Sequence, residues 1–418
     1  MKHLFAIPLL TLALCGCSND SDPAPSPDPV YPPAQPIAQE LTAAESRAAQ
    51  ATSNFGADFF AAACAVAESP DDNVLVSPAG VQFMLSMLAN VTDDAATKEI
   101  TDLLGCTDVE ALNSLAAKYV KLLPQVDQRV TTTVANALWH NQLHTLTPAL
   151  SQSLSRHYES VLFPFDPSDY ALLADNINAW SRENTDGMID GVADPIDFEQ
   201  RKPDAVFANA IYFNGKWAAP FDAKDTRTRP FGGSKGRIDA EMMNAQFYNQ
   251  KIIGGEHYTA CKLQLGDKSF SAIMVLPDPG FRIDHLIAAG ELTDIMSQPT
   301  VDATLTISFP KFKYKMEKPI DLAHALRQAG CSEVLKLQYL SIFEDYDKEL
   351  EINLEQKSTV EFDEEGAKAA SVTTSTAASS PGPTLGKEVT LVFDRPFAFF
   401  ICENSTNLIL FAGKIMNL

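Results

Sequence analysis

The chain has 418 residues, of which 45% are hydrophobic and 21% are charged. These proportions are typical of a globular protein and exclude a wholly disordered chain or a collagen-like fibre. The formal net charge is −22 and no basic run interrupts it, so we expect no nucleic-acid partner.

The first residues carry an export pattern. Met1-Lys2-His3 precedes an apolar run over 4–14, which is too short to anchor stably across a bilayer. The following Leu14-Cys15-Gly16-Cys17 resembles a bacterial lipoprotein signal, in which cleavage leaves Cys17 lipidated. We therefore expect a signal peptide over 1–16, with an ordinary secretory signal cut nearby as the alternative.

A proline-rich segment follows the export pattern. Residues 18–22 resemble the acidic tag that directs lipoproteins of some Gram-negative bacteria to the outer face of the outer membrane. Seven prolines over 23–36 predict a stiff tether of about 3.1 Å per residue. We expect residues 17–37 to be the lipidated cysteine and tether, and residues 38–418 to be one domain at the cell surface, attached to the membrane only through the lipid.

Helical spacing dominates the first half of this domain, and strand-like runs dominate the second half. The spacing predicts helices over 57–68, 80–88, 95–104, 148–158 and 170–185, the last starting near Asp166 or Ser168. Strands are predicted over 206–212, 261–265, 270–276, 303–309, 350–352, 359–362, 389–393, 397–402 and 408–416. This order predicts an α+β fold with mostly antiparallel sheets.

Motifs that suggest catalysis or metal binding do not fit their local sequence. Gly232-Gly233-Ser234-Lys235-Gly236 matches a nucleophile elbow formally, but its polar flanks favour a solvated turn. His140 and His144 are four residues apart, yet no third ligand is near them in sequence. We therefore expect neither enzyme activity, nor a metal, nor a cofactor.

Sulfur-containing residues are interpreted as packing groups. Met242 and Met243 are expected to fill gaps in a core, the alternative being a soft binding patch. The cysteines beyond the export pattern form no CxxC pair. They are expected to be buried free thiols: Cys64, Cys106, Cys261, Cys331 and Cys402.

The segment 364–380 is nearly free of large side chains and lies between strand-like runs. The roughly 30 residues after it cannot form a domain alone, so it is an excursion from within one fold. Alternate positions in it are small and uncharged: Ala367, Ala369, Ser371, Thr373, Ser375 and Ala377. If the segment became a central strand, these alternate side chains would share one face and could be buried without desolvating a charge. A loop that is exposed at first but suited to enter a sheet later predicts a metastable protein.

Several motifs along the domain occur in a recognisable order. They are NVLVSP at 73–78, NALW at 136–139, INAW at 177–180 with TDG at 185–187, NAIYFNGKW at 209–217, FPKF at 309–312, DRPF at 394–397 and LFAGKI at 410–415. In these motifs the chain resembles the serpins, the serine protease inhibitor family, over essentially the whole domain.

The resemblance implies a serpin fold with three mostly antiparallel β-sheets, about nine helices and an exposed reactive-centre loop at about 364–388. It also implies a monomeric, irreversible inhibitor of serine or cysteine endopeptidases. In that mechanism the protease forms an acyl-enzyme on the loop, and the cleaved loop then inserts into the largest sheet and distorts the protease. A non-inhibitory member that acts as a binding or structural module is the alternative.

The resemblance also assigns roles to individual residues. The hinge and inserting segment align with Glu364, Glu365, Gly366, Ala367, Ala369, Ser371 and Thr373, and Gly366 is expected to absorb a change of backbone conformation. Ser77 and Asn209 align with a polar cluster beneath the parting strands, and Trp217 aligns with the site where insertion begins. The usual histidine of that cluster is Gln356 and a usual serine is Gly80, from which we expect altered rates rather than lost function.

The bait bond can be placed in three ways. Family spacing from Gly366 reaches the bond between Ser380 and Pro381, but most serine proteases reject proline after the attacked residue. One step back gives Ser379 and Ser380, which we prefer and which predicts elastase-like or subtilisin-like targets. Counting back from Pro396 gives Leu385 and Gly386 instead, which predicts chymotrypsin-like targets.

Overall fold

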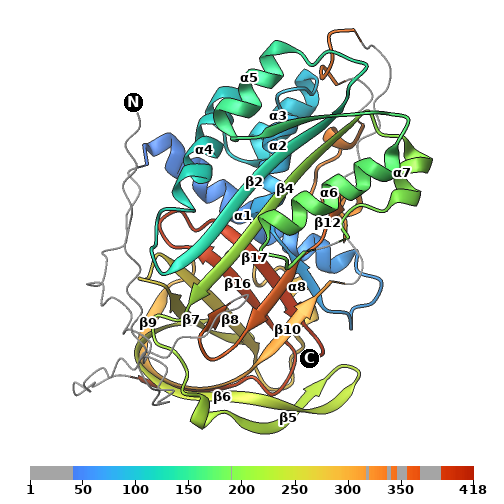
Figure 1. Cartoon of the computed structure of the whole chain (residues 1–418). Helices are drawn as coiled ribbons and strands as arrows, with labels where there is room; N and C mark the ends of the chain where they lie inside the picture. The colour runs from blue at the N-terminus through green and yellow to red at the C-terminus, as the bar shows by residue number, and fades with distance from the viewer. Residues whose placement is uncertain (1–40, 190, 317–319, 337–339, 346–354, 368–386) are drawn as a thin grey trace, which may run out of the picture. The chain divides into compact units, whose positions relative to one another are not determined.

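The computed structural model describes residues 41–189, 191–316, 320–336, 340–345, 355–367 and 387–418. Every described element belongs to the unit Ala34–Leu418. Helices and mostly antiparallel sheets combine in this unit, so the predicted α+β class is confirmed (Figure 1). None of the helices in the described ranges is long and apolar enough to cross a membrane.

Nine α-helices lie in the described part of the chain. They are α1 Ala43–Ala65, α2 Pro78–Leu88, α3 Asp94–Leu103, α4 Val109–Leu122, α5 Pro148–His157, α6 Tyr170–Asn184, α7 Pro195–Arg201, α8 Ile283–Ala288 and α9 Leu322–Gln328. Two 3-10 turns, η1 Ala223–Asp225 and η2 Val334–Lys336, accompany them. Helix α1 begins at a capping box, in which the Glu45 amide donates to Thr42 and the Thr42 amide donates to Glu45.

The predicted helices are found, with shifted ends. Helix α1 starts well before residue 57, and the cap of α6 is Asp169, one residue beyond the expected region. Helices α7, α8 and α9 were not predicted, because six or seven residues are too few to show a helical period. Helix α4 was also not predicted, although Asp108 caps it in the usual way.

A six-stranded sheet has the order β10-β13-β14-β4-β2-β3. Its strands are β10 Phe312–Lys315, β13 Thr359–Phe362, β14 Gly366–Ala367, β4 Ala205–Lys216, β2 Val130–Asn141 and β3 Val161–Phe165. Strands β2 and β4 pair along nearly their whole lengths, from Val130 opposite Gly215 to His140 opposite Ala205. Among the described residues of this sheet, only β2 and β3 pair in parallel.

A nine-stranded sheet has the order β1-β17-β16-β8-β7-β6-β9-β15, with β5 paired to β6. Its strands are β1 Val74–Val76, β17 Ile409–Ile415, β16 Phe397–Glu403, β8 Phe270–Pro277, β7 Tyr258–Leu265, β6 Gly236–Gly254, β9 Thr300–Pro310, β15 Lys387–Val392 and β5 Arg227–Gly233. A third sheet pairs β11 Ile320–Asp321 with β12 Glu355–Gln356. The strand predicted over 350–352 lies outside the described residues.

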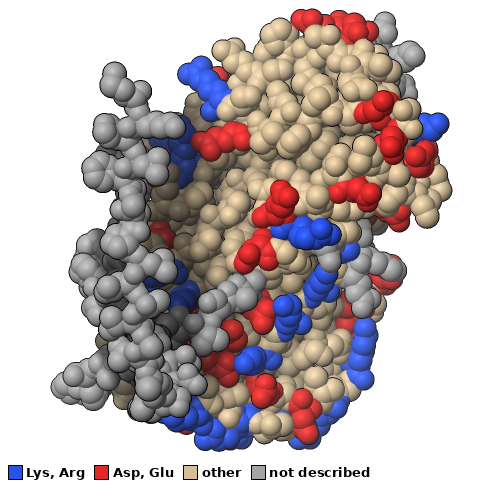
Figure 2. Space-filling view, viewed as in Figure 1, with Lys and Arg blue, Asp and Glu red and all other residues tan. Residues whose placement is uncertain are grey.

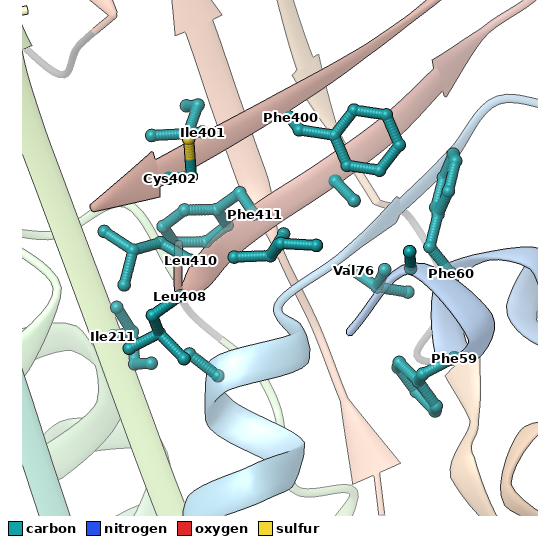
Figure 3. Close-up of a cluster of buried hydrophobic side chains, with 14 of the residues drawn as sticks. Phe59, Phe60, Val76, Ile211, Phe400, Ile401, Cys402, Leu408, Leu410 and Phe411 are labelled. Atoms are coloured by element: carbon teal, nitrogen blue, oxygen red, sulfur yellow. The ribbon is translucent and has the colours of Figure 1, made fainter. Parts of the chain in front are cut away.

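A buried apolar cluster joins the two large sheets to helix α1. Figure 3 shows Phe60 of α1 beside Phe400 of β16, and Leu408, which directly precedes β17, beside Ile211 of β4. The rings of Phe60 and Phe400 meet edge to face at 5.3 Å between centroids. One face of β4 is therefore packed on the core, which fixes the strand's register because a slip by one residue would expose these side chains.

The structure also decides the smaller sequence interpretations. Ser234 and Lys235 form a turn between β5 and β6, so the expected turn is confirmed and no helix follows Ser234. Met242 and Met243 are both fully buried, as expected of gap-filling residues. His140 lies at the end of β2, and no group of His, Cys, Asp or Glu within the described residues could hold a metal.

The cysteine prediction holds only in part. All five predicted thiols are free, but only those of Cys261, Cys331 and Cys402 belong to buried residues. Cys64 and Cys106 lie at partly exposed positions, Cys64 near the end of α1 and Cys106 just after α3. Burial nevertheless raises the pKa of Cys64 to about 12 and that of Cys106 to about 11, so both thiols stay protonated at neutral pH.

Candidate functional site

The two-residue strand β14 lies between β13 and β4. Ala367 is opposite Phe362 of β13 on one side and opposite Gly215 of β4 on the other. Gly366 is opposite Lys216, and Ala367 is only 1% exposed. Within the described residues, β4 and β13 are joined in the sheet only through β14, so the predicted hinge occupies the first positions of a strand between them.

Gly366 is required here by the close approach of β4. A Cβ atom at this position would lie 2.2 Å from the carbonyl oxygen of Gly215 and 2.7 Å from the Cα of Lys216. Gly366 is not among the glycines with positive φ. In this state a glycine is therefore needed at position 366 because a side chain would not fit beside β4. The sequence had suggested a different reason, the backbone freedom of glycine.

The carboxylate of Glu364 fastens the segment before β14. It accepts a hydrogen bond from Lys311 Nζ and one from Thr226 Oγ1, each at 2.9 Å. Burial by itself would raise the pKa of Glu364, but the bonds from Lys311 and Thr226 outweigh it and bring the pKa below 4.5. Lys and Arg side chains gather over β10 and the β5–β6 hairpin, whereas few lie over α6 and α7 (Figure 2). Of these basic residues, Lys311 favours the ionised carboxylate of Glu364.

Trp217 holds the turn that leads into β14. Its backbone amide donates to the Glu365 carbonyl at 2.7 Å, and its Nε1 donates to the Asp363 carbonyl at 2.9 Å. The indole is 2% exposed and stacks on Phe362, with 5.9 Å between ring centroids. Trp217, Thr226, Lys311 and Glu364 are together called the hinge latch below.

The sequence identified only two members of the hinge latch. Trp217 and Glu364 were predicted site residues, whereas Lys311 and Thr226 were given no role. Lys311 does lie within the FPKF motif at 309–312, which was the one available signal. Glu365 contributes through its backbone carbonyl.

Three predicted residues, Ser77, Asn209 and Gln356, line a cavity of about 90 Å³ beside β4. The Ser77 amide donates to Gln356 Oε1 at 2.8 Å, and Gln356 Nε2 donates to the Ser77 carbonyl at 2.9 Å. The Ser77 hydroxyl donates to the carbonyl of Leu410 at 2.7 Å. Trp217 does not line this cavity, so the predicted site divides into a hinge part and a cavity part.

Gly80 lets helix α2 approach the two amide side chains. A Cβ atom there would lie 2.9 Å from Asn209 Oδ1 and 3.2 Å from Gln356 Nε2. The Gly80 amide donates to the Ser77 hydroxyl at 3.3 Å, as the cap of the helix. A serine at position 80 would require both amides to move, so Gly80 and Gln356 fit each other.

A second cavity, of about 20 Å³, continues along the same side of β4. It is lined by Tyr212 and Phe213 of β4 and by Val360 and Glu361 of β13, with Ala367 at one end. The first cavity reaches from Val206 to Ile211 of the same strand. We call this space between β4 and the segment 356–362 the seam.

The other predicted site residues lie outside the described part of the chain. They are Cys17, Ala369, Ser371, Thr373, Ser379, Ser380, Pro381, Leu385 and Gly386.

Comparison with known proteins gives one family over most of the chain. A family model described as "Serpin (serine protease inhibitor)" matches residues 50–418. Human glia-derived nexin is 25% identical over 364 residues, which cover 84% of this chain and 89% of that protein. Pig plasminogen activator inhibitor 1 is 26% identical over 390 residues, covering 89% and 93%.

Solved structures show the same fold. The native state of the thermophilic serpin tengpin has a TM-score of 0.76 at 23% identity, and the match covers 91% of this chain and 96% of tengpin. Protease nexin-1, solved with heparin, has a TM-score of 0.74 at 22% identity, with coverages of 90% and 99%. The fold is therefore the serpin fold.

Proposed function

Because the chain belongs to the serpin family of serine protease inhibitors, we propose that it irreversibly inhibits serine endopeptidases, and cysteine endopeptidases as a second class. The protease serine attacks a loop carbonyl, its proton passes by way of the protease's base to the departing amine, and an ester to the loop remains. The loop then inserts into the six-stranded sheet before water can cleave this ester. The inhibitor itself turns over no substrate.

The observation that supports this proposal is the seam with β14 at its end. Gly366 and Ala367 already pair with Lys216 and Gly215, and the edge of β4 beyond them has no partner strand among the described residues. If the same register continued, residue 377 would lie opposite Ala205, the first residue of β4. About ten further residues, 368–377, at roughly 3.3 Å each would give about 33 Å of new strand.

This length favours one of the three bait bonds. A strand that ends at residue 377 leaves the bond between Ser379 and Ser380 just beyond the sheet. The bond between Leu385 and Gly386 would leave several unpaired residues before the trapped protease. We therefore propose Ser379–Ser380 as the attacked bond, and elastase-like or subtilisin-like proteases as the targets, because Ala377, Ala378 and Ser379 suit small specificity pockets.

We further propose that the protein is an exported lipoprotein on the outer face of the outer membrane, where it acts as a monomer. The lipid on Cys17 and the tether over 17–37 would be its only membrane attachment. Labelling cells with a radioactive fatty acid tests this. The label should enter the wild-type chain and be lost in Cys17→Ala, and equal labelling of the two would contradict the proposal.

The inhibitory function is tested by mixing the protein with pancreatic elastase or with subtilisin and running a denaturing gel. The wild type should form an SDS-resistant complex. Ala367→Arg would place a charge at a site that is 1% exposed, so the loop should be cleaved without complex formation. Ala288→Arg, at an exposed position of α8, is the matched control and should still form the complex.

The non-inhibitory alternative predicts a different gel. The wild type would then be cleaved like Ala367→Arg, with no complex across a panel of serine and cysteine proteases. Cleavage would also leave its melting temperature unchanged, whereas insertion should raise it.

A further inference from the structure

The centre of strand β2 is tied to its surroundings through Asn136. This residue lies directly opposite Asn209 in the β2–β4 ladder and is 2% exposed. Its Oδ1 accepts a hydrogen bond from Asn209 Nδ2 at 2.8 Å, and its Nδ2 donates to the carbonyl of Tyr158 at 2.9 Å. The ladder between β2 and β4 is thus connected by side chains to the residue that ends helix α5.

Tyr158 continues this connection into the helices. Its ring is fully buried, and its hydroxyl donates to Asn113 Oδ1 at 2.5 Å. Asn113 Nδ2 donates to Asn90 Oδ1 at 2.9 Å, while Asn90 Nδ2 donates back to Asn113 Oδ1 at 3.1 Å. The Ser153 hydroxyl donates to Asn90 Oδ1 at 2.7 Å. Asn90, Asn113, Ser153 and Tyr158 are called the anchor cluster below.

The anchor cluster joins three helical regions of the described structure. Asn113 belongs to α4 and Ser153 to α5, and Asn90 follows α2, whose residues are all buried. Burial raises the pKa of Tyr158, so its hydroxyl remains a proton donor at neutral pH. Each amide both donates and accepts, which satisfies buried polar groups that would otherwise destabilise this region.

The opposite side of β4 has no equivalent connection. At the same level, no hydrogen bond joins Asn209 to Gln356 among the described residues, and Gln356 is bonded to the backbone of Ser77 instead. The cavity of about 90 Å³ lies between them. In the described structure, the side-chain hydrogen bonds of Asn209 therefore go to β2.

We propose that the anchor cluster, acting through Asn136, positions β4 for strand insertion by keeping it on β2 while the sheet parts along the seam. An incoming strand needs a straight edge of free N–H and C=O groups. If β4 could separate from β2, this edge would be lost while the acyl-enzyme was still open to water. This inference rests on the proposed inhibitory function, and its members are positioning residues rather than contacts of the protease.

Tyr158→Phe tests the proposal by removing only the hydroxyl bond to Asn113. The measured quantity is the number of inhibitor molecules consumed for each protease molecule trapped. Tyr158→Phe should raise this number severalfold, because slower insertion lets more acyl-enzyme hydrolyse. Asn113→Ala should raise it similarly, and the double variant should add little, because the two residues form one bond.

Ser269→Ala is the matched control. It removes a hydroxyl that is similarly buried, at 2% exposure, and that donates to the Val126 carbonyl at 3.0 Å rather than to the anchor cluster. Ser269→Ala should lower the melting temperature as Tyr158→Phe does. It should nevertheless leave unchanged the number of inhibitor molecules consumed for each protease molecule trapped. If Tyr158→Phe and Ser269→Ala consumed equal numbers of inhibitor molecules for each protease trapped, the proposal would be overturned. The anchor cluster would then contribute only ordinary packing.

Amide hydrogen exchange of the native protein, without any protease, keeps this test separate from that of the proposed function. Tyr158→Phe should speed exchange in peptides covering 130–141 and 205–216 but not in 359–362. If exchange in the peptides 130–141 and 205–216 were unchanged, the proposal would also be overturned. If the wild type trapped no protease, the proposed function would fail, and exchange alone would decide whether β4 is anchored.

Discussion

The two ends of the seam differ in how β4 meets the segment across from it. At the hinge end, Trp217 donates two hydrogen bonds and the Glu364 carboxylate accepts two more. In the middle, Asn209 and Gln356 face the same cavity with no bond between them in the described structure. Resistance to opening is therefore concentrated at the hinge, because separating Asn209 from Gln356 breaks no hydrogen bond of the described structure.

The largest effect should follow from Glu364→Lys. The variant loses both bonds of the carboxylate and places two ammonium groups together, so we expect unfolding to become easier by about 2–3 kcal/mol. Urea unfolding measures this. Glu365→Lys makes the same charge change next to it, where the residue contributes its backbone carbonyl, and should cost less than about 0.5 kcal/mol. Equal losses would show that the hinge end is not specially held.

Gly366→Ala should have the next largest effect. The added methyl group cannot fit 2.2 Å from a backbone oxygen, so β14 should leave the sheet at a loss of about 1–2 kcal/mol. Hydrogen exchange at Lys216 and Trp217 should then become faster. Gly254→Ala is the control, because a Cβ atom there meets nothing within 4 Å. Slow exchange in Gly366→Ala would contradict the close approach.

Acid should weaken the hinge end selectively. The folded protein lowers the pKa of Glu364 below 4.5, so its contribution to stability is present above that pH and is lost as pH falls through the folded value. The stability difference between the wild type and Glu364→Gln should therefore shrink from neutral pH to below 4.5. A difference that is constant with pH would mean that the carboxylate charge does not matter.

The smallest effect concerns the inserted state. The register that sets Ala367 opposite Phe362 would set residue 368 opposite Glu361, and opposite charges across strands contribute about 0.2–1 kcal/mol. In the loop-cleaved protein, Lys368→Glu should lower the melting temperature, and adding Glu361→Lys should recover only part of it, because Glu361 also pairs with Lys313 at 2.9 Å. Exchanging Lys368 with Glu365 is the control and should restore nothing. Failure of the first exchange would place the inserted strand in another register.

Much of the fold could be predicted from sequence, because its motifs lie within buried strands such as β4 and β17. Asn209 and Trp217 belong to one uninterrupted motif, and their separation along β4 follows from strand geometry. Short elements could not be predicted in this way. Helix α8 has six residues and β14 has two, so neither shows a period.

The polar contacts of the site were harder to predict than its strands. Lys311 and Glu364 are 53 residues apart, and Tyr158 and Asn113 are 45 apart. Nothing in the local sequence of either pair indicates the other member, because such contacts depend on how strands and helices pack. Asn136 lies in a quoted motif, but only the ladder reveals that it faces Asn209.

Strand β14 has a consequence for the rate of the proposed insertion. In polymer terms, joining the first residues of a strand to a sheet is the slow nucleation step, because chain entropy is lost before many contacts form. Here Gly366 and Ala367 are in register before any protease arrives. What remains is growth from an existing nucleus, and each added residue gains its pairing at once. Cleavage of the loop would then allow the strand to lengthen. Insertion would compete with hydrolysis of the acyl-enzyme only after its slowest step, nucleation, was complete.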